Sequence, residues 1–400
     1  SVPDTLRELG DLARWRRSAL RQMTNPVVVG ITGSCGKTTV KEMTASIMEQ
    51  QWPERIDRPV HRVLKTQGNF NNLIGLPLTL LPASVTQRGV ILEMGMNQFG
   101  EIERLTEIGD PDIACITNIA SAHLEGLGNI EGVARAKGEL FQGTGDRAIH
   151  VVNLDDSWVV KQAKSYTNQT IRFGISDQAL AAKPDVWATE TSLDSNGMVR
   201  FRLHVGGQNQ FVRLNSPGMH NCINGCAAAA IGVAAGIDIE TIVEGLQQFQ
   251  PAPNRMAQLM TPAGLNLLND TYNANPVSMS SAISTLAGLS ARKRVAILGD
   301  MLELGETSNK LHHELGQIAA AAGLDLIAVT GNFSEHIRRG ALDAGMNEHQ
   351  VISFNEKQRV VDWVKELVHS GQLQSNDWIL LKASRGLALD TVVEDLMQDC

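Results

Sequence analysis

A glycine-rich turn between a short apolar run and a helical stretch constrains this chain more than any other feature. The run covers residues 27–32, the segment GITGSCGKTT covers residues 30–39, and the helical stretch extends from Lys37 to about Glu49. A lysine and a hydroxyl residue that open a helix after such a turn are typical of a phosphate-binding loop. The backbone N–H groups of the loop and the positive end of the helix can then bind phosphate oxygens. The sequence therefore predicts an α/β domain built on a nucleotide-binding strand–loop–helix unit.

The side chains of this loop have distinct expected tasks. Gly33 and Gly36 allow the backbone to curl around phosphate, Lys37 supplies charge to the β- and γ-phosphates, and the Thr38 hydroxyl can bind Mg²⁺. The general motif has glycine at position 31, where this chain has Ile31. The expected nucleotide-binding residues of the loop are Gly33, Ser34, Cys35, Gly36, Lys37, Thr38 and Thr39. Kinases, GTPases, motors and ligases all carry such loops, so other segments must decide between them.

Strands and helices alternate after the loop. Apolar runs at 89–95, 113–119 and 148–153 are separated by helical stretches, the last at 130–141, which predicts a mostly parallel sheet covered on both faces. Residues 170–214 differ, because two runs flank a pair of glycines, Gly206 and Gly207, as in a β-hairpin. Those two runs are residues 198–205 and 208–214, and helices are expected at 220–235 and 239–249.

A proline-rich segment, PAPNR at residues 251–255, marks the expected domain boundary. Beyond it the alternation of strands and helices restarts and predicts a second α/β domain of Rossmann-like topology. Its expected strands are residues 295–299, 326–331, 351–354 and 378–382, and its expected helices are residues 308–322, 334–344, 357–368 and 388–397.

Composition narrows the class of protein. A chain of 400 residues with 43% hydrophobic residues predicts two or three domains with buried cores. A net charge of −8 gives no support for nucleic-acid binding. Five scattered cysteines indicate reduced thiols in a cytoplasm, and no apolar run has the roughly 20 residues of a membrane span. Cys222 and Cys226 with His220 lie in an alanine-rich helical segment without a second ligand pair, which disfavours a zinc site.

Polar residues at the ends of predicted strands are candidate site residues. Glu93 ends one strand, where a carboxylate can bind Mg²⁺, and His123 follows another strand near Asn118, as a candidate metal ligand. Lys137 lies inside a helix, where a lysine by itself usually faces solvent. Residues 65–72, KTQGNFNN, form either an exposed loop or a substrate-binding loop. Its asparagines are Asn69, Asn71 and Asn72.

Taken together, several segments resemble the Mur ligase superfamily in their order and spacing. They are TGSCGKTT, GNFNNLIGLPLTLL, LEMGMNQFGEI, ITNIASAHLEGLG, ARAKGELF, GMHNCINGCAAA, NDTYNANPVSM and ILGDMLELGE. The match runs across almost the whole chain, and the loop variant with Ile31 is itself similar to that family's T-G-x-x-G-K-[ST] pattern. NDTYNANPVSM and ILGDMLELGE are most similar to the branch that adds D-alanyl-D-alanine to UDP-N-acetylmuramoyl-tripeptide (UDP-MurNAc-tripeptide).

The resemblance implies a role for each matching residue. Lys37 and Thr38 would hold ATP phosphates and a first Mg²⁺, with Glu93 on the same ion. His123 would bind a second Mg²⁺, and Lys137 matches a lysine that becomes carbamylated and then acts as a carboxylate-like metal ligand. With Arg255, these residues form the expected catalytic set.

Further roles are implied beyond the loop. Asn221 and Asn224 match an adenine-contacting pair, Arg255 would reach the γ-phosphate, and Asp270 would hold the ribose. Ala383 and Asn254 depart from the family pattern, which has other residues before Ser384 and Arg255. The expected substrate-binding residues are Asn69, Asn71, Asn72, Asn118, Asn273, Asn275, Ser384 and Arg385.

The implied reaction is ATP-dependent amide-bond formation through an acyl phosphate, with UDP-MurNAc-tripeptide and D-Ala-D-Ala as substrates. A cytoplasmic monomer without nucleic-acid or membrane partners is expected. Because the expected ATP contacts lie on both sides of residues 251–253, the site should be completed on domain closure. The alternatives are a tripeptide-forming Mur ligase, folylpolyglutamate synthetase, a P-loop phosphotransferase, and a nucleotide-binding regulator without catalysis.

The resemblance also bears on domain organisation, because Mur ligases of this kind have three domains. Residues 26–250 match the central ATP-binding domain and residues 251–400 the C-terminal domain. Residues 1–25 form an expected amphipathic helix or linker that resembles the exit from an N-terminal UDP-binding domain, which is itself missing from the chain. We therefore expect this chain to bind ATP but to bind the UDP-substrate weakly.

Overall fold

The computed structural model of the chain describes residues 2–54 and 61–399. It consists of two compact units. The first comprises the chain up to Ser192 with Arg200–Asn215 and His220–Gln250, and the second comprises Leu193–Val199, Ser216–Met219 and the chain from Pro251 on. Two short segments of the range 26–250 thus group with the second unit. No helix in the described ranges combines the length and the apolar character needed to cross a bilayer.

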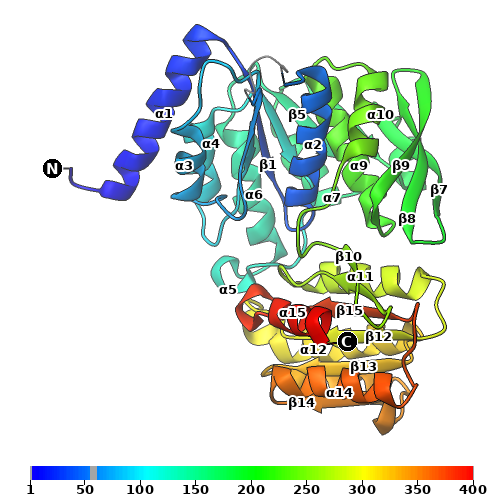
Figure 1. Cartoon of the computed structure of the whole chain (residues 1–400). Coiled ribbons are helices and arrows are strands. Elements are labelled where there is room, and N and C mark those ends of the chain that lie inside the picture. Colours follow the sequence, from blue (N-terminus) through cyan, green and yellow to red (C-terminus); the bar gives the residue numbers. More distant parts are fainter. Residues whose placement is uncertain (1, 55–60, 400) are drawn as a thin grey trace. The chain divides into compact units, whose positions relative to one another are not determined.

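A nine-stranded sheet organises the first unit, in the order β2-β3-β1-β4-β5-β6-β7-β8-β9 (Figure 1). Strands β2 to β7 pair in parallel, and β8 and β9 form the expected hairpin through Gly206 and Gly207, both with positive φ. The strands are β1 Val27–Thr32, β2 Val63–Lys65, β3 Gly89–Glu93, β4 Ile113–Ile116, β5 Ile149–Asn153, β6 Thr170–Gly174, β7 Val186–Leu193, β8 Met198–Val205 and β9 Gln208–Pro217. The mostly parallel sheet expected from the sequence is confirmed.

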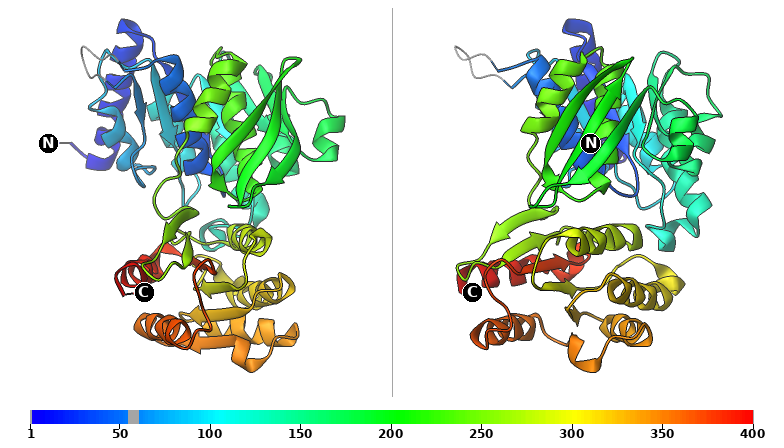
Figure 2. Two further views of the ribbon diagram at one scale, coloured as in Figure 1. Left: turned by 45° about the vertical axis from the view of Figure 1, so that its right-hand side comes forward. Right: turned by 90° about the vertical axis from the view of Figure 1, so that its right-hand side faces the viewer.

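Helices cover this sheet on both faces (Figures 1 and 2). Helix α2 packs against α9 and α10, whereas α4 packs against α6. The helices are α1 Thr5–Met23, α2 Lys37–Gln51, α3 Gly75–Leu80, α4 Glu101–Gly109, α5 Leu124–Leu127, α6 Ile130–Gly143, α7 Ser157–Ala163, α8 Asp177–Ala181, α9 His220–Ala234 and α10 Ile239–Gln248.

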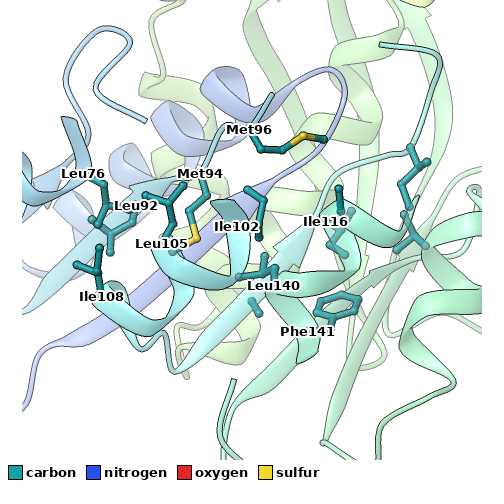
Figure 3. Packing of buried hydrophobic residues seen from close by; sticks show 14 of the residues in the cluster. Leu76, Leu92, Met94, Met96, Ile102, Leu105, Ile108, Ile116, Leu140 and Phe141 are labelled. Atoms are coloured by element: carbon teal, nitrogen blue, oxygen red, sulfur yellow. The ribbon is translucent and has the colours of Figure 1, made fainter. Parts of the chain in front are cut away.

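One hydrophobic cluster joins the sheet to α3, α4 and α6. Leu92 and Ile116 of the strands pack with Leu76, Leu105 and Leu140 of the helices, as Figure 3 shows, and all five are fully buried. Contiguous burial of this kind fixes the strands, and therefore the loops at their carboxyl ends, in one arrangement.

Helix α1 packs on α3 and α4 and is tied to the loop after α4. Asp4 caps its N-terminus by accepting hydrogen bonds from two backbone N–H groups, and Ala13 joins the hydrophobic cluster. Arg17, whose side chain is 9% exposed, forms an ion pair of 2.7 Å with Asp110. The charged stretch at residues 5–23 is therefore an ordered, packed helix.

The second unit has a six-stranded sheet in the order β10-β11-β15-β12-β13-β14. Only β10 runs antiparallel to its neighbour, so the Rossmann-like expectation is confirmed. The strands are β10 Ala257–Met260, β11 Asn266–Asn269, β12 Arg294–Leu298, β13 Leu326–Thr330, β14 Val351–Phe354 and β15 Trp378–Lys382. The helices are α11 Pro276–Gly288, α12 Ser308–Ala321, α13 Ser334–Asp343, α14 Lys357–His369 and α15 Asp390–Asp399, with short 3₁₀ turns at Gly305–Thr307, Glu348–Gln350 and Arg385–Leu387.

Candidate active site

The glycine-rich loop joins β1 to α2, and two of its positions require glycine. Gly33 has φ of 151°, and a Cβ atom there would lie 1.9 Å from Thr117 Oγ1. Gly36 has φ of 80°, and a Cβ atom there would lie 2.5 Å from Asn224 Oδ1. Any side chain at either position would clash and would strain the backbone, so both glycines are structural requirements of the loop.

The loop is braced by the segment that follows β4. Asn118 accepts a hydrogen bond from Cys35 N–H (2.9 Å) and donates one to Cys35 C=O (3.1 Å). Thr117 Oγ1 donates to the same carbonyl (2.6 Å), and the Ser34 hydroxyl donates to Ala120 C=O (3.0 Å). Asn118 was expected among the substrate-binding residues, but both ends of its amide hold the loop in shape.

The N-terminus of α2 is built to receive an anion. Its N-cap residue is Gly36, no side chain caps the helix, and no acidic residue lies in its first turn. The first-turn N–H groups and the helix dipole therefore present positive potential at the loop. Lys37 adds a full charge there, and its ammonium donates a 2.7 Å hydrogen bond to Gly33 C=O within the loop.

Glu93, at the end of β3, is a buried carboxylate directly beside this loop. Its side chain is 1% exposed, and it accepts hydrogen bonds from Thr38 Oγ1 at 2.8 Å and from Asn71 Nδ2 at 2.9 Å. Thr38 and Glu93, which the resemblance implies bind one Mg²⁺ ion, therefore lie in contact. The Asn71 amide fixes one oxygen of this carboxylate, and its expected role toward a substrate stays a prediction.

The donors fit a magnesium ion. Nowhere in residues 2–54 and 61–399 do three or more His, Cys, Asp or Glu side chains gather closely enough to hold a metal ion. Mg²⁺ normally binds one or two carboxylates and completes its octahedron with water and substrate phosphate oxygens. One carboxylate and one hydroxyl beside a phosphate loop are that kind of donor set.

Lys41 was missed by the sequence reasoning. It lies one helical turn after Lys37, is 1% exposed, and its ammonium reaches Thr66 C=O at 2.7 Å and Glu42 at 2.9 Å. A mid-helix lysine carries no signal in the sequence that separates it from a solvent-facing one. It is buried where α2 contacts β2 and β3 and where Thr66 follows β2.

Lys137, on α6, is a buried lysine as the resemblance implied. It is 1% exposed and lies on the buried face of α6. Burial lowers its pKa well below the ordinary lysine value, and the positive charge of Lys37 lowers it further. An uncharged amine near the phosphate loop is consequently favoured.

His123 lies at the end of the segment that braces the loop, before the short helix α5. Its backbone is left-handed, with φ of 55°. A non-glycine residue in that region costs free energy and is often found at functional sites. The expected metal-binding role of His123 stays a prediction.

The two asparagines of α9 lie against the loop. Asn221 and Asn224 are buried and hydrogen-bonded to each other at 2.9 Å, and Asn224 is the residue that closes off the space at Gly36. Their expected contact with adenine stays a prediction. Of the other asparagines, Asn72 accepts hydrogen bonds from the backbone N–H groups of Ile74 and Gly75 where α3 begins, and Asn69 is exposed.

The expected residues of the second unit gather near the carboxyl ends of β11 and β15. Asp270 accepts hydrogen bonds from Lys382 Nζ at 2.5 Å and from Met256 N–H at 3.2 Å, so both of its oxygens are engaged. Lys382 also donates to Asn273 C=O at 2.9 Å. The guanidinium of Arg255 stacks on Tyr272, 3.8 Å from the ring centroid.

Three further residues of the second unit already have structural partners. Asn275 caps α11, and the Ser384 hydroxyl, 3% exposed, accepts Leu302 N–H at 2.9 Å. Arg385 is exposed and pairs with Asp390 at 2.6 Å. The expected roles of these residues toward a dipeptide, and of Arg255 and Asp270 toward ATP, stay predictions.

The phosphate loop with its buried carboxylate, and the Rossmann-like second unit, define a nucleotide-dependent α/β enzyme. Family models agree: the Mur ligase middle domain matches residues 31–232, and the Mur ligase, glutamate ligase domain, matches residues 254–385. The chain belongs to the Mur ligase family.

Within that family the chain is similar over its whole length to ligases named for the addition of D-alanyl-D-alanine. It is 36% identical over 399 residues to UDP-N-acetylmuramoyl-tripeptide--D-alanyl-D-alanine ligase of Escherichia coli, covering 100% of this chain and 82% of that protein. A crystal structure of MurF from Acinetobacter baumannii matches with a TM-score of 0.87 and 34% identity, over 100% of this chain and 82% of that one. MurF from Thermotoga maritima, solved in complex with ADP, matches with a TM-score of 0.84 and 26% identity, over 100% and 84%.

Proposed function

We propose that this chain is an ATP-dependent, ADP-forming ligase that joins D-Ala-D-Ala to UDP-MurNAc-tripeptide in peptidoglycan precursor synthesis. The observation that carries the proposal is the buried pair of Thr38 and Glu93, 2.8 Å apart at the phosphate loop. It occurs in a chain 36% identical to a ligase of that name over 399 residues.

The proposed reaction has two steps. A carboxylate oxygen of the tripeptide attacks the γ-phosphorus of ATP, the bond between that phosphorus and the β–γ bridging oxygen breaks, and ADP leaves. The amine of D-Ala-D-Ala then attacks the carbon of the acyl phosphate. A tetrahedral intermediate expels phosphate, the nitrogen loses a proton, and an amide bond remains.

The residues of the first unit supply the phosphate-handling part of this chemistry. The N-terminus of α2 and Lys37 bind and orient the phosphates, and Thr38 and Glu93 would hold a magnesium ion beside them. When bound, that ion neutralises charge that would otherwise repel the attacking carboxylate. A second ion, with His123 and a carbamylated Lys137 among its ligands, belongs to the same proposal.

The carbamate has a physical basis in the environment of Lys137. An uncharged amine adds to carbon dioxide, forms a carbamate and releases one proton. The resulting anion lies next to Lys37, whose positive charge disfavours a protonated amine at Lys137 and attracts a negative group there.

The proposal includes the cellular setting. The partners are the two small-molecule substrates rather than nucleic acid or membrane, and the proposed working form is a cytoplasmic monomer. Cys35, Cys115, Cys222 and Cys226 form no disulfide among the described residues, which suits a reducing compartment.

A phosphate-release assay tests the function. Purified protein with ATP, Mg²⁺ and high concentrations of UDP-MurNAc-tripeptide should release phosphate when D-Ala-D-Ala is added, and not with single amino acids or glutamate. Activity with glutamate alone would assign the chain to another ligase of the family. A stable phosphorylated product would show that the protein is a phosphotransferase and not a ligase.

A further inference from the structure

Lys41 is one of the largest fully buried side chains of the described residues, and its surroundings are anionic. Its ammonium lies 2.9 Å from Glu42 Oε1 and 3.9 Å from Glu93 Oε2, and it donates a 2.7 Å hydrogen bond to Thr66 C=O. A buried ammonium is costly unless such partners compensate it. This arrangement ties α2, which carries Thr38, to the segment after β2.

Thr66 connects Lys41 to Glu93 through two hydrogen bonds. Its carbonyl accepts from Lys41, and its hydroxyl accepts the backbone N–H of Glu93 at 3.0 Å. Five residues further along the same segment, Asn71 donates to Glu93 Oε1. Lys41 therefore holds in place the segment that fixes both the backbone and one oxygen of Glu93.

Glu42 compensates the charge of Lys41 from the other side. It also accepts a 2.6 Å hydrogen bond from Lys65. Burial raises the pKa of Glu42, but the hydrogen bonds from Lys41 and Lys65 outweigh that effect and leave the pKa below the ordinary value. The charges alternate from Lys65 through Glu42 and Lys41 to Glu93, and Lys41 is the member that reaches both carboxylates.

We propose that Lys41 is a positioning residue that orients Glu93 for the metal ion of the bound nucleotide. The inference rests on the proposed function in so far as Glu93 binds that ion. Groups that orient metal ligands typically change metal affinity roughly 10–100-fold when they are removed.

The test compares Lys41→Met with Lys65→Met. Both variants remove a lysine from Glu42, but no ion pair joins Lys65 to Glu93 among the described residues. Binding of Mn²⁺ to the ADP-saturated protein is measured by electron paramagnetic resonance, because Mn²⁺ accepts the same oxygen ligands as Mg²⁺. ADP affinity is measured separately with excess chelator, and thermal unfolding reports on folding.

Lys41→Met should weaken Mn²⁺ binding at least about tenfold and leave metal-free ADP affinity unchanged, whereas Lys65→Met should bind Mn²⁺ like the wild type. If a folded Lys41→Met protein binds Mn²⁺ as tightly as the wild type or more tightly, the positioning role of Lys41 is overturned, and the proposed function is not affected. Absence of ADP-dependent Mn²⁺ binding in the wild type would overturn the metal assignment of the proposed function as well.

A second variant covers the case in which Lys41→Met does not fold. Lys41→Met combined with Glu42→Gln removes one positive and one negative charge together, and Glu42→Gln alone is its reference. The double variant should bind Mn²⁺ at least about tenfold more weakly than Glu42→Gln. Equal binding by the two proteins would overturn the positioning role.

Discussion

At the residue scale, the shape of the phosphate loop depends on two glycines whose missing side chains leave space for neighbouring polar groups. Gly33 leaves the space that Thr117 Oγ1 occupies, and Gly36 leaves the space that Asn224 Oδ1 occupies. The loop is therefore already shaped by the protein before any phosphate arrives, and Asn118 holds that shape through the backbone of Cys35.

Gly33→Ala tests this preformed loop. The added Cβ would clash with Thr117 and strain the backbone, so we expect a loss of about 1–3 kcal/mol in unfolding free energy and much weaker ADP binding. Gly206→Ala is the matched control, because Gly206 also has positive φ (54°) but no atom lies within 4 Å of its added Cβ. Calorimetric titration with Mg·ADP distinguishes them, and equal ADP affinity in both variants would contradict the loop's role.

Lys137→Ala tests the carbamate. The variant should be nearly inactive, because the proposed anionic metal ligand is absent. Wild-type protein in labelled bicarbonate should show a carbamate signal by carbon NMR that the variant lacks. An active Lys137→Ala protein, or a wild type without that signal, would remove the carbamate from the mechanism.

The residues that the sequence could indicate are those with a motif. Lys37, Thr38 and Glu93 lie at fixed positions relative to the loop or to a strand end, and the structure brings them together. Lys41 and Thr66 belong to no motif. Their contact depends on the packing of α2 against β2. This packing is a tertiary contact that cannot be derived from the spacing of residues along the chain.

At the element scale, an aromatic contact joins β5 to α6, the helix that carries Lys137. His150 of β5 stacks on Phe141 of α6, with ring centroids 4.3 Å apart, and its Nε2 lies 2.8 Å from Thr144 Oγ1. Phe141 lies one turn after Lys137 on the same helix, so this packing helps to set the helix that carries the buried amine.

The pH dependence of stability should show this packing. Burial lowers the pKa of His150 from 6.5 to about 4, so below pH 6.5 the unfolded chain takes up a proton that the folded protein resists. Stability should therefore fall as the pH falls from 6.5 towards 4, by up to about 2 kcal/mol from this residue.

His150→Phe should remove this component while it keeps an aromatic ring against Phe141. Urea unfolding of both proteins across that pH range measures the effect. The free energy of unfolding of the variant should vary less with pH than that of the wild type. Parallel pH curves would show that the imidazole is not the group responsible.

Elements marked by a continuous apolar run or a glycine turn were predictable, including the four-residue strand β14. The β1 strand, the β8–β9 hairpin and the helices after the loop follow from apolar runs and glycine turns. Strand β2 has the sequence VLK, and β11 has only two leucines between asparagines, so neither shows a strand pattern. They are strands because they pair with β3 and β15, which is a consequence of the assembled sheet.

At the scale of the whole molecule, the function rests on the extent of the similarity rather than on the loop. A phosphate loop is compatible with many activities. The two family models together reach from residue 31 to residue 385 and so include residues of both units. The choice of the carboxylate and amine substrates belongs to this scale, because no single residue described above specifies it.

In the proposed reaction, ATP activates the carboxylate of the tripeptide by phosphoryl transfer, and every later step depends on this one. The most direct measurement uses UDP-MurNAc-tripeptide whose reacting carboxylate carries the heavy oxygen isotope, with ATP, Mg²⁺ and D-Ala-D-Ala. The attacking oxygen stays on phosphorus when the acyl phosphate breaks down, so the released phosphate should contain one labelled oxygen. Phosphate without the label, or phosphate released at the same rate without D-Ala-D-Ala, would contradict the account.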